Sequence, residues 1–285
     1  MTTANFFWHG KELTLYEVTS LKSFVKKKFK VDVYSYQKLK YVPGVNFINA
    51  TKIVPKSLFL QYLKNKSNGS LATFSDFFRI KLMKLNKGWW FDMDILCLKN
   101  AKDFDKLENQ KDIVAGYEDN QEIANGVLKI NNSKIIDNLL DEMQKKGVQV
   151  SRGHIGPRLL KKIVKEKKLE YQIVNQKYFF PINYTNFEKI FDPNNYLLTK
   201  KLYKKSYICH FYNEILIRHN YPKNIFPPKG SFLYTKFCEV NNSKGWNYYL
   251  PKITSSRLIG INKTKLSLKE HLQDLIPSFW RFFNK

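Results

Sequence analysis

The segment that most constrains the fold is TFSDFFRIKLMKLNKGWWFDMD, residues 73–94. Residues 75–85 repeat apolar side chains at helical spacing and predict a largely buried helix. Residues 86–88, Asn-Lys-Gly, would end that helix. Residues 89–98 are aromatic and aliphatic, as a buried strand is, except for two aspartates. The segment therefore predicts a buried helix, a tight break and a buried strand in succession.

The two exceptions, Asp92 and Asp94, would lie on the same face of that strand because side chains alternate along a strand. Two like charges on an apolar strand are costly unless a positive group lies beside them. A divalent cation such as Mn²⁺ or Mg²⁺ takes carboxylate oxygens and would remove this cost. Asp76 and Arg79, one helical turn apart, can project toward the same site. A bare Asp-x-Asp is also common at surface strand ends that bind no metal.

The wider pattern is Ser-Asp-x-x-Arg, a short helix, and then Gly-aromatic-aromatic-x-Asp-x-Asp. It resembles the sugar-binding region of family 32 glycosyltransferases, which include α-1,4-glycosyltransferases, yeast-type mannosyltransferases and the large clostridial glucosylating toxins. The matching residues are Ser75, Asp76, Arg79, Gly88, Trp89, Trp90, Asp92 and Asp94. The resemblance implies a GT-A-type α/β fold, with a Rossmann-like, mostly parallel sheet flanked by helices. It also implies that Asp76 and Arg79 hold hydroxyls of a donor sugar.

The first 36 residues predict the start of such a sheet. Residues 5–10 predict a short apolar strand, residues 14–28 an amphipathic helix and residues 31–36 a second strand. Thr14 with Glu17 has the spacing of a capping box at the start of that helix. The resemblance implies that Trp8, His9 and Gly10 meet the base and ribose of a nucleotide, and an aromatic face can stack on a base. Tyr34 is a further candidate for the base pocket, although packing in the core would explain it equally.

Other elements are expected along the rest of the chain. Helices are predicted over residues 56–63 and 133–146, strands over residues 112–117 and 169–178, and a loop with one helical turn over residues 100–110. Residues 125–131 predict a turn followed by a strand. The resemblance places Asn125 and Gly126 toward the acceptor, although Asn-Gly is also the strongest ordinary turn signal.

Two later motifs extend the resemblance. Gly156 and Pro157 begin a predicted helix whose free backbone N–H groups could meet a sugar or phosphate. Residues 207–216, YICHFYNEIL, resemble a His-Leu-aromatic-Asn-Glu box of bacterial relatives. By that resemblance His210 is a third metal ligand and Asn213 a metal or phosphate contact. Imidazole favours Mn²⁺ over Mg²⁺, whereas a lone histidine in an apolar strand is otherwise a satisfied core residue.

The formal net charge of +25 indicates an anionic partner, such as a membrane surface or nucleic acid. Nearly all of this charge is lysine, and base-reading proteins depend on arginine for bidentate contacts, so no specific nucleic acid is expected. An AT-rich coding sequence would give the same bias toward lysine and asparagine.

Cysteine usage, hydropathy and the chain's ends bear on location and domains. Cys97, Cys209 and Cys238 have no metal-type spacing and suggest a reduced, cytoplasmic compartment. No segment reaches the length needed to span a bilayer, and no signal peptide is expected. Residues 1–240 are expected to form the catalytic domain and residues 241–285 an extension. Its basic, aromatic end, residues 267–285, would lie on a membrane or pack on the domain.

The resemblance implies a metal-dependent, retaining glycosyltransferase that moves a hexose from a UDP- or GDP-sugar to a glycan. Polysaccharide, lipopolysaccharide and lipid-linked acceptors, at the inner face of a membrane, are compatible with this reading. A second hypothesis is a basic nucleic-acid-binding protein or metal-dependent nuclease, with lysines on phosphates and the aspartates on Mg²⁺. A third is a sugar-binding relative without catalytic activity.

Overall fold

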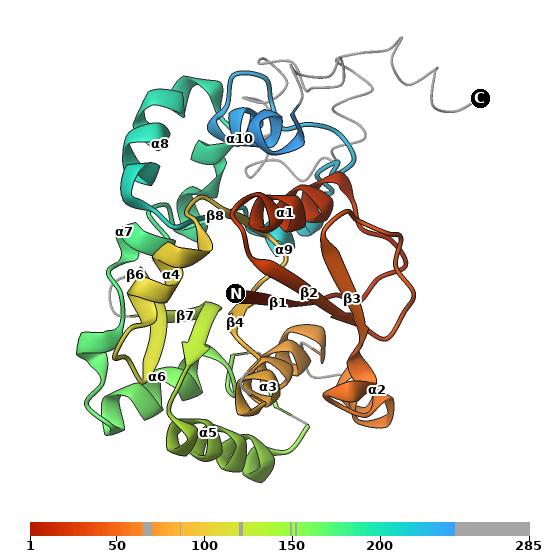
Figure 1. Cartoon of the computed structure of the whole chain (residues 1–285), viewed down its shortest axis with the longest axis vertical. Helices are drawn as coiled ribbons and strands as arrows, with labels where there is room; N and C mark the ends of the chain where they lie inside the picture. The colour runs from red at the N-terminus through yellow and green to blue at the C-terminus, as the bar shows by residue number, and fades with distance from the viewer. Residues whose placement is uncertain (65–69, 86, 120–121, 149, 152, 243–285) are drawn as a thin grey trace.

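The computed structural model of the chain describes residues 1–242, apart from 65–69, 86, 120–121, 149 and 152. Its centre is a six-stranded sheet of order β3-β2-β1-β4-β7-β6 (Figure 1). The strands are β1 Thr3–Phe7, β2 Lys30–Ser35, β3 Val45–Asn49, β4 Trp89–Phe91, β6 Ile113–Asp119 and β7 Glu122–Ile130. Neighbours from β3 to β4 are parallel, and β7 is antiparallel to both β4 and β6. The predicted α/β class with a mostly parallel sheet is confirmed.

Helices cover both faces of this sheet because consecutive strand residues point to opposite sides. Phe7 and Trp90 pack into one core, with α2 Lys56–Lys64, α3 Ser70–Lys84, α5 Ser133–Lys146 and α6 Pro157–Glu166. Phe6 and Trp89, their immediate neighbours, pack into the other, with α1 Leu15–Lys26, α4 Ala101–Glu108 and α7 Gln176–Phe179. Figure 1 shows α1 and α3 on opposite sides of the sheet.

A smaller unit closes one end of the sheet. Its two strands, β5 Ile95–Cys97 and β8 Ile208–His210, are antiparallel and separate from the main sheet. A third hydrophobic cluster lies beside them. The elements around it are α8 Tyr196–Leu202, α9 Asn213–Arg218, α10 Phe232–Asn241 and the 3₁₀ turns Tyr184–Ile190, Pro193–Asn195 and Tyr203–Lys205. Short 3₁₀ turns at Ala50–Lys52 and Glu170–Gln172 complete the described elements.

Local chemistry explains where several helices begin. Thr14 caps α1 in a capping box with Glu17, as the sequence predicts. Pro157 occupies the first turn of α6, where a missing N–H costs nothing. Asn100 and Asp103 form a capping box at the start of α4, so the prediction of a mostly irregular 100–110 segment is wrong.

Three further expectations are corrected. Residues 89–98 are two strands in different sheets, because Asp92–Asp94 form a turn between β4 and β5. Asn125 and Gly126 lie within β7 and form no turn. Residues 169–178 hold a 3₁₀ turn and α7, and only Val174 bridges to β6, at Gly116. The strand β3 was not predicted at all.

The structure describes the chain as far as residue 242. The expected extension, residues 241–285, therefore lies outside the described part except for its first two residues, and its basic, aromatic end, residues 267–285, lies wholly outside it. The boundary near residue 240 stays a prediction. Within the described residues, no helix is both long and apolar enough to span a membrane.

Candidate functional site

The predicted ligand residues lie where two neighbouring parallel strands end. Asp92 directly follows β4, and Trp8 directly follows β1, which pairs with β4 in parallel. Parallel strands bring their carboxyl ends to one edge, where α/β proteins bind ligands. The sequence predicted a site role for both Asp92 and Trp8, and the sheet order explains why they lie at the same edge.

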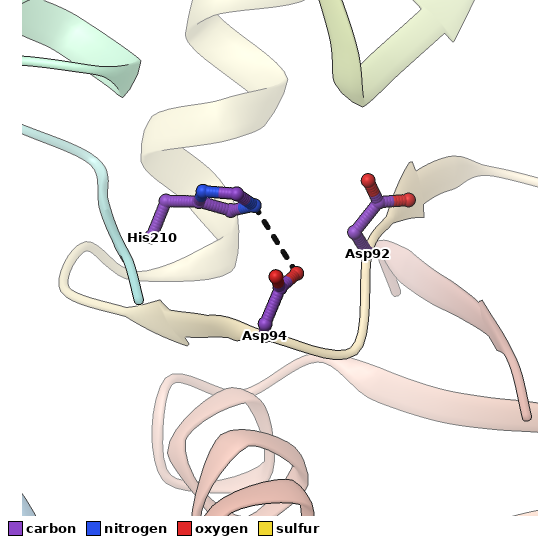
Figure 2. Close-up of side chains that lie close together, drawn as sticks. All are labelled: Asp92, Asp94 and His210. Carbon is purple, nitrogen blue, oxygen red and sulfur yellow. Dashed lines mark ion pairs between the residues drawn. The ribbon is translucent and has the colours of Figure 1, made fainter. Parts of the chain in front are cut away.

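The turn between β4 and β5 brings the two aspartates together by a route that differs from the predicted one. They do not alternate along a strand. Asp94 directly precedes β5, and its carbonyl accepts a hydrogen bond from the Phe211 backbone N–H at 2.9 Å. The register of β5 with β8 pairs Ile95 with His210, which sets the imidazole beside Asp94 (Figure 2).

Asp92, Asp94 and His210 each offer a ligand atom, and these atoms lie within 4.8 Å of one another. The Nε2 of His210 is 3.1 Å from Oδ1 of Asp94, so the wider separations involve Asp92. Atoms bound to one octahedral ion at about 2.1 Å are separated by about 3 to 4 Å. Two carboxylates and one imidazole suit Mn²⁺ and its neighbours. The three residues therefore fit a divalent ion, and Figure 2 shows them converging from the end of β8 and from the turn between β4 and β5.

The second oxygen of Asp94 is held by the chain that follows β8. Oδ2 accepts a hydrogen bond of 2.7 Å from the backbone N–H of Asn213. Tyr212 makes this possible because it adopts a left-handed conformation, with φ +54°, at the start of α9. The Tyr212 hydroxyl donates to the Ile182 carbonyl at 2.7 Å, which fixes the ring against His210.

Asp94 and His210 each shift the pKa of the other. Burial alone would raise the pKa of Asp94, but His210 and the Asn213 N–H outweigh it and lower that pKa. Burial would lower the pKa of His210, but the Asp94 carboxylate outweighs it and raises that pKa. Without an ion, the site therefore favours an imidazolium beside a carboxylate.

Asp92 is the most exposed of the three, with 31% of its side chain accessible, and β4 and β7 hold it in place. Oδ1 accepts a 2.8 Å hydrogen bond from the Trp90 indole, and the Asp92 N–H donates to the Gly126 carbonyl at 2.8 Å. A β-carbon on Gly126 would lie 2.9 Å from Oδ2 of Asp92. Glycine at this position therefore leaves room for the carboxylate over the strand.

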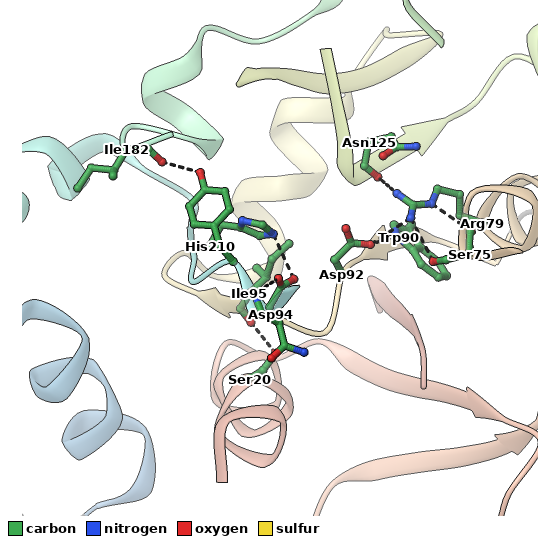
Figure 3. Close-up of polar contacts among 12 residues, drawn as sticks. Ser20, Ser75, Arg79, Trp90, Asp92, Asp94, Ile95, Asn125, Ile182 and His210 are labelled. Atoms are coloured by element: carbon green, nitrogen blue, oxygen red, sulfur yellow. Dashed lines mark hydrogen bonds and ion pairs between the residues drawn. The ribbon is translucent and has the colours of Figure 1, made fainter. Parts of the chain in front are cut away.

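Arg79 lies on α3, is buried, and connects this helix to β4 and β7. Its guanidinium lies 3.3 Å from Asp92 Oδ1 and 3.4 Å from Asp76 Oδ1, and donates to the Asn125 carbonyl at 2.5 Å. It also stacks 4.8 Å from the Trp90 ring, as Figure 3 shows from the side. Arg79 therefore lies within ion-pair distance of both Asp76 and Asp92, and the predicted roles of Asp76 and Arg79 at the site stay predictions.

Asp76 is buried beside the same guanidinium nitrogen, Nη2 of Arg79, that approaches Asp92. Its Oδ1 accepts a 2.8 Å hydrogen bond from the Asn125 side chain. Gly156, which precedes Pro157 at the start of α6, approaches so closely that a β-carbon would lie 2.1 Å from Oδ2 of Asp76. The predicted acceptor residues Asn125, Gly126, Gly156 and Pro157 thus gather around the aspartates of α3 and β4. Contact of Asp76 or Arg79 with a sugar stays a prediction, because both are 95% or more buried among protein groups.

The predicted nucleotide residues divide into two groups. Trp8, His9 and Gly10 are partly exposed at the sheet edge, and the indole N–H of Trp8 is buried with no partner among the described residues. Tyr34 is only 3% exposed and packs against Phe78, so it belongs to the core. Burial raises the pKa of its hydroxyl to about 12.

Sequence reasoning missed Lys223. Its ammonium group donates to Asn213 Oδ1 at 2.7 Å and to Oε1 of Glu17, a fully buried carboxylate on α1. It also lies 5.9 Å from the centre of the Trp8 ring. Lys223 therefore joins the predicted nucleotide edge to the segment that holds Asp94. The one signal in the sequence was Glu17 itself. An acidic residue among the apolar residues of α1 needs a cationic partner if it is buried.

Comparison with known proteins agrees with this geometry. Residues 130–243, which are less than half of the chain, match a family described as the α-1,4-glycosyltransferase conserved region, and this match confirms the expected resemblance. The matched region holds His210 and Asn213 but begins after Asp92 and Asp94. No curated protein matches the chain.

Solved glycosyltransferases show weaker similarity. PaToxG glycosyltransferase is 15% identical over 59% of this chain and 68% of its own, with a TM-score of 0.43. The WbbM bifunctional glycosyltransferase is 11% identical over 90% of this chain and 51% of its own, with a TM-score of 0.49. Mouse xyloside xylosyltransferase 1 is 13% identical over 62% and 86%, with a TM-score of 0.38. No donor or acceptor is transferred from similarities this low.

Proposed function

We propose that this glycosyltransferase moves a hexose from a UDP- or GDP-sugar to a glycan acceptor, with retention of configuration and with the help of Mn²⁺ or Mg²⁺. The observation that carries the proposal is the meeting of Asp92, Asp94 and His210 at the edge where β1 and β4 end. The alternative of a metal-dependent nuclease finds less support, because the surroundings of the aspartates are aromatic and carboxylate-rich and offer one arginine that is already engaged.

In this proposal the protein's own groups hold the diphosphate end of the donor. Asp94 and His210 would hold the ion, and Asp92, being more exposed, would approach both the ion and the donor. The bound ion would neutralise charge on the leaving diphosphate. Asn213 keeps Asp94 in place through its backbone N–H, and its side chain is near enough to the same edge to contact a phosphate. No step needs a protein nucleophile: the acceptor hydroxyl would bond to the anomeric carbon as the bond from that carbon to the diphosphate oxygen breaks, and the departing phosphate oxygen would take the hydroxyl proton.

The remaining donor contacts follow from position. Trp8 and its neighbours His9 and Gly10 would take the base and ribose, because an indole at the strand end offers a stacking face. Arg79 orients Asp92, and Asp76 with Arg79 would reach the hexose after a small opening of the α6 start. Asn125, Gly126, Gly156 and Pro157 then lie on the acceptor side.

We further propose a cytoplasmic enzyme that acts at the inner face of a membrane on a lipopolysaccharide, polysaccharide or lipid-linked acceptor. The three cysteines are free, and the net charge of +25 favours an anionic surface.

The experiment that tests the function is nucleotide-sugar binding and turnover by wild type and by Asp94→Asn. Thermal shift against UDP-Gal, UDP-Glc, UDP-GlcNAc and GDP-Man, with Mn²⁺ or with EDTA, identifies the donor. The variant should lose the Mn²⁺-dependent part of the shift and most turnover. Asp141→Asn, an exposed aspartate of α5, is the matched control and should behave as wild type. Full turnover by Asp94→Asn in EDTA would rule the proposal out.

A further inference from the structure

A cavity lies among α1, α8, α10 and residues 96–99. Its volume is about 980 Å³, and none of the residues assigned above to donor, acceptor or metal lines it. Leu96, Leu98 and Phe232 contribute apolar surface to its wall. Figure 1 shows α8 and α10 side by side at one end of the molecule, with α1 below them and α5 at the opposite end.

The charge around this cavity is almost entirely positive. Two of the lysines already contact α10. Lys26 donates to the Glu239 carbonyl, and Lys236 forms an ion pair with the Glu239 carboxylate. Five more lysines line the cavity and form no ion pair within the described part of the chain: Lys27, Lys99, Lys200, Lys201 and Lys204. Uncompensated ammonium groups around one cavity repel each other, and an anionic ligand would relieve that repulsion.

The helix that supplies Lys200 and Lys201 also exposes leucines. In α8, Leu197 is 77% exposed, Leu198 is 47% exposed and Leu202 is 38% exposed. Exposed leucines beside lysines on a short helix are typical of a segment that lies in a membrane interface, because the apolar side chains enter the acyl boundary while the ammonium groups stay at the headgroups.

We propose that α8 and the lysine-lined cavity beside it form a surface that docks on an anionic lipid bilayer, with a headgroup phosphate in the cavity. The exposed leucines favour a bilayer over a nucleic acid, which would meet only charge. The chain's own residues 243–285 are a poor occupant, since they carry eight Lys and Arg against two Asp and Glu. The surface deepens the membrane location proposed above, and its test does not depend on sugar transfer.

The test is sedimentation of the full chain with phosphatidylcholine vesicles and with phosphatidylcholine–phosphatidylglycerol vesicles over a range of NaCl concentrations. We expect binding only to the anionic vesicles. The variant K200Q/K201Q/K204Q should bind about 10- to 100-fold more weakly, since each lysine near the surface contributes substantially. The matched control K134Q/K165Q/K167Q removes the same charge from exposed positions of α5 and of α6 and the residue after it, and should lose no more than about threefold.

A second pair of variants tests the leucines. L197S/L198S should lose the binding that persists at high salt, whereas Leu60→Ser, which changes a leucine 43% exposed on α2, should keep it. Equal losses by the two lysine variants would reduce the effect to net charge and overturn the proposal. Tight binding to soluble polyphosphate without vesicle binding would overturn it too, because the cavity would then serve a soluble anion. All variants are checked for retained nucleotide-sugar thermal shift, which separates this surface from the transferase site.

Discussion

A β-carbon placed on Gly156 would lie 2.1 Å from Oδ2 of Asp76, although Gly156 directly precedes α6, Asp76 lies on α3 and the two residues are 80 positions apart. Gly156→Ala must therefore displace a buried carboxylate that Asn125 and Arg79 hold. We expect a loss of about 1–3 kcal/mol in the free energy of unfolding, as for other overpacked sites. Urea denaturation measures it.

A double-mutant cycle shows whether the contact with Asp76 is the cause. In an Asp76→Ala background the same glycine substitution should cost clearly less, because the clashing oxygens are gone. Equal costs in both backgrounds would mean that the backbone of Gly156, and not its approach to Asp76, sets the effect.

Metal affinity should rise with pH. The pKa of His210 is raised and that of Asp94 is lowered, so below the raised pKa an ion must displace a proton from the imidazole. Each pH unit below that pKa should weaken Mn²⁺ binding by about tenfold. Calorimetry in two buffers of different ionisation enthalpy should show proton release, and His210→Gln should bind weakly with no such release.

The same two shifts set the pH dependence of the metal-free protein. The His210 contribution is fully present below its unfolded pKa of 6.5 and is lost as pH rises through the raised folded value. The Asp94 contribution is present above 3.8 and is lost as pH falls through the lowered folded value. Urea midpoints in EDTA should therefore favour pH 5–6 over pH 8 in wild type more than in His210→Gln; identical profiles would contradict the pairing.

Arg79 should tolerate no conservative replacement. Lysine keeps the charge but cannot reach Asp76, Asp92 and the Asn125 carbonyl together. We expect Arg79→Lys to lose about 2–4 kcal/mol of unfolding free energy and most Mn²⁺ affinity, because Asp92 loses its orientation. Arg218→Lys, in an exposed pair with Glu214, should cost less than about 0.5 kcal/mol. Calorimetric Mn²⁺ titration and urea denaturation measure both.

Lys223→Met should leave the buried Glu17 carboxylate without its cation. A loss of about 3–5 kcal/mol is expected for breaking such a pair from one side. The double variant E17Q/K223M should recover much of that loss, since neither charge remains. If the double variant is as unstable as the single one, the lysine acts through packing against Trp8 instead.

The sequence was a good guide where one local signal decided the structure. Thr14 with Glu17 predicted the start of α1, and the apolar spacing of residues 75–85 predicted most of α3. The identities of Asp92, Asp94 and His210 as neighbours were predicted from a motif resemblance, and the structure brings them together.

What local patterns could not supply was the path of the chain between those signals. Asp92 and Asp94 fit a continuous strand by composition, yet the register of Ile95 with His210 draws residues 95–97 into another sheet. Asn125-Gly126 carries the usual turn signal, but Gly126 is needed inside β7 for the approach of Asp92. Lys223 is unremarkable in sequence, since its partner on α1 is 206 residues away.

The turn at residues 92–94 is also the joint between the six-stranded sheet and the β5–β8 pair. Because Asp92 belongs to one side of this joint and His210 to the other, an ion held by both would clasp the two sheets to each other. Binding of the ion should then have an effect beyond the site itself. Amide hydrogen exchange along β8 should become slower, and sliding between the sheets would release the ion.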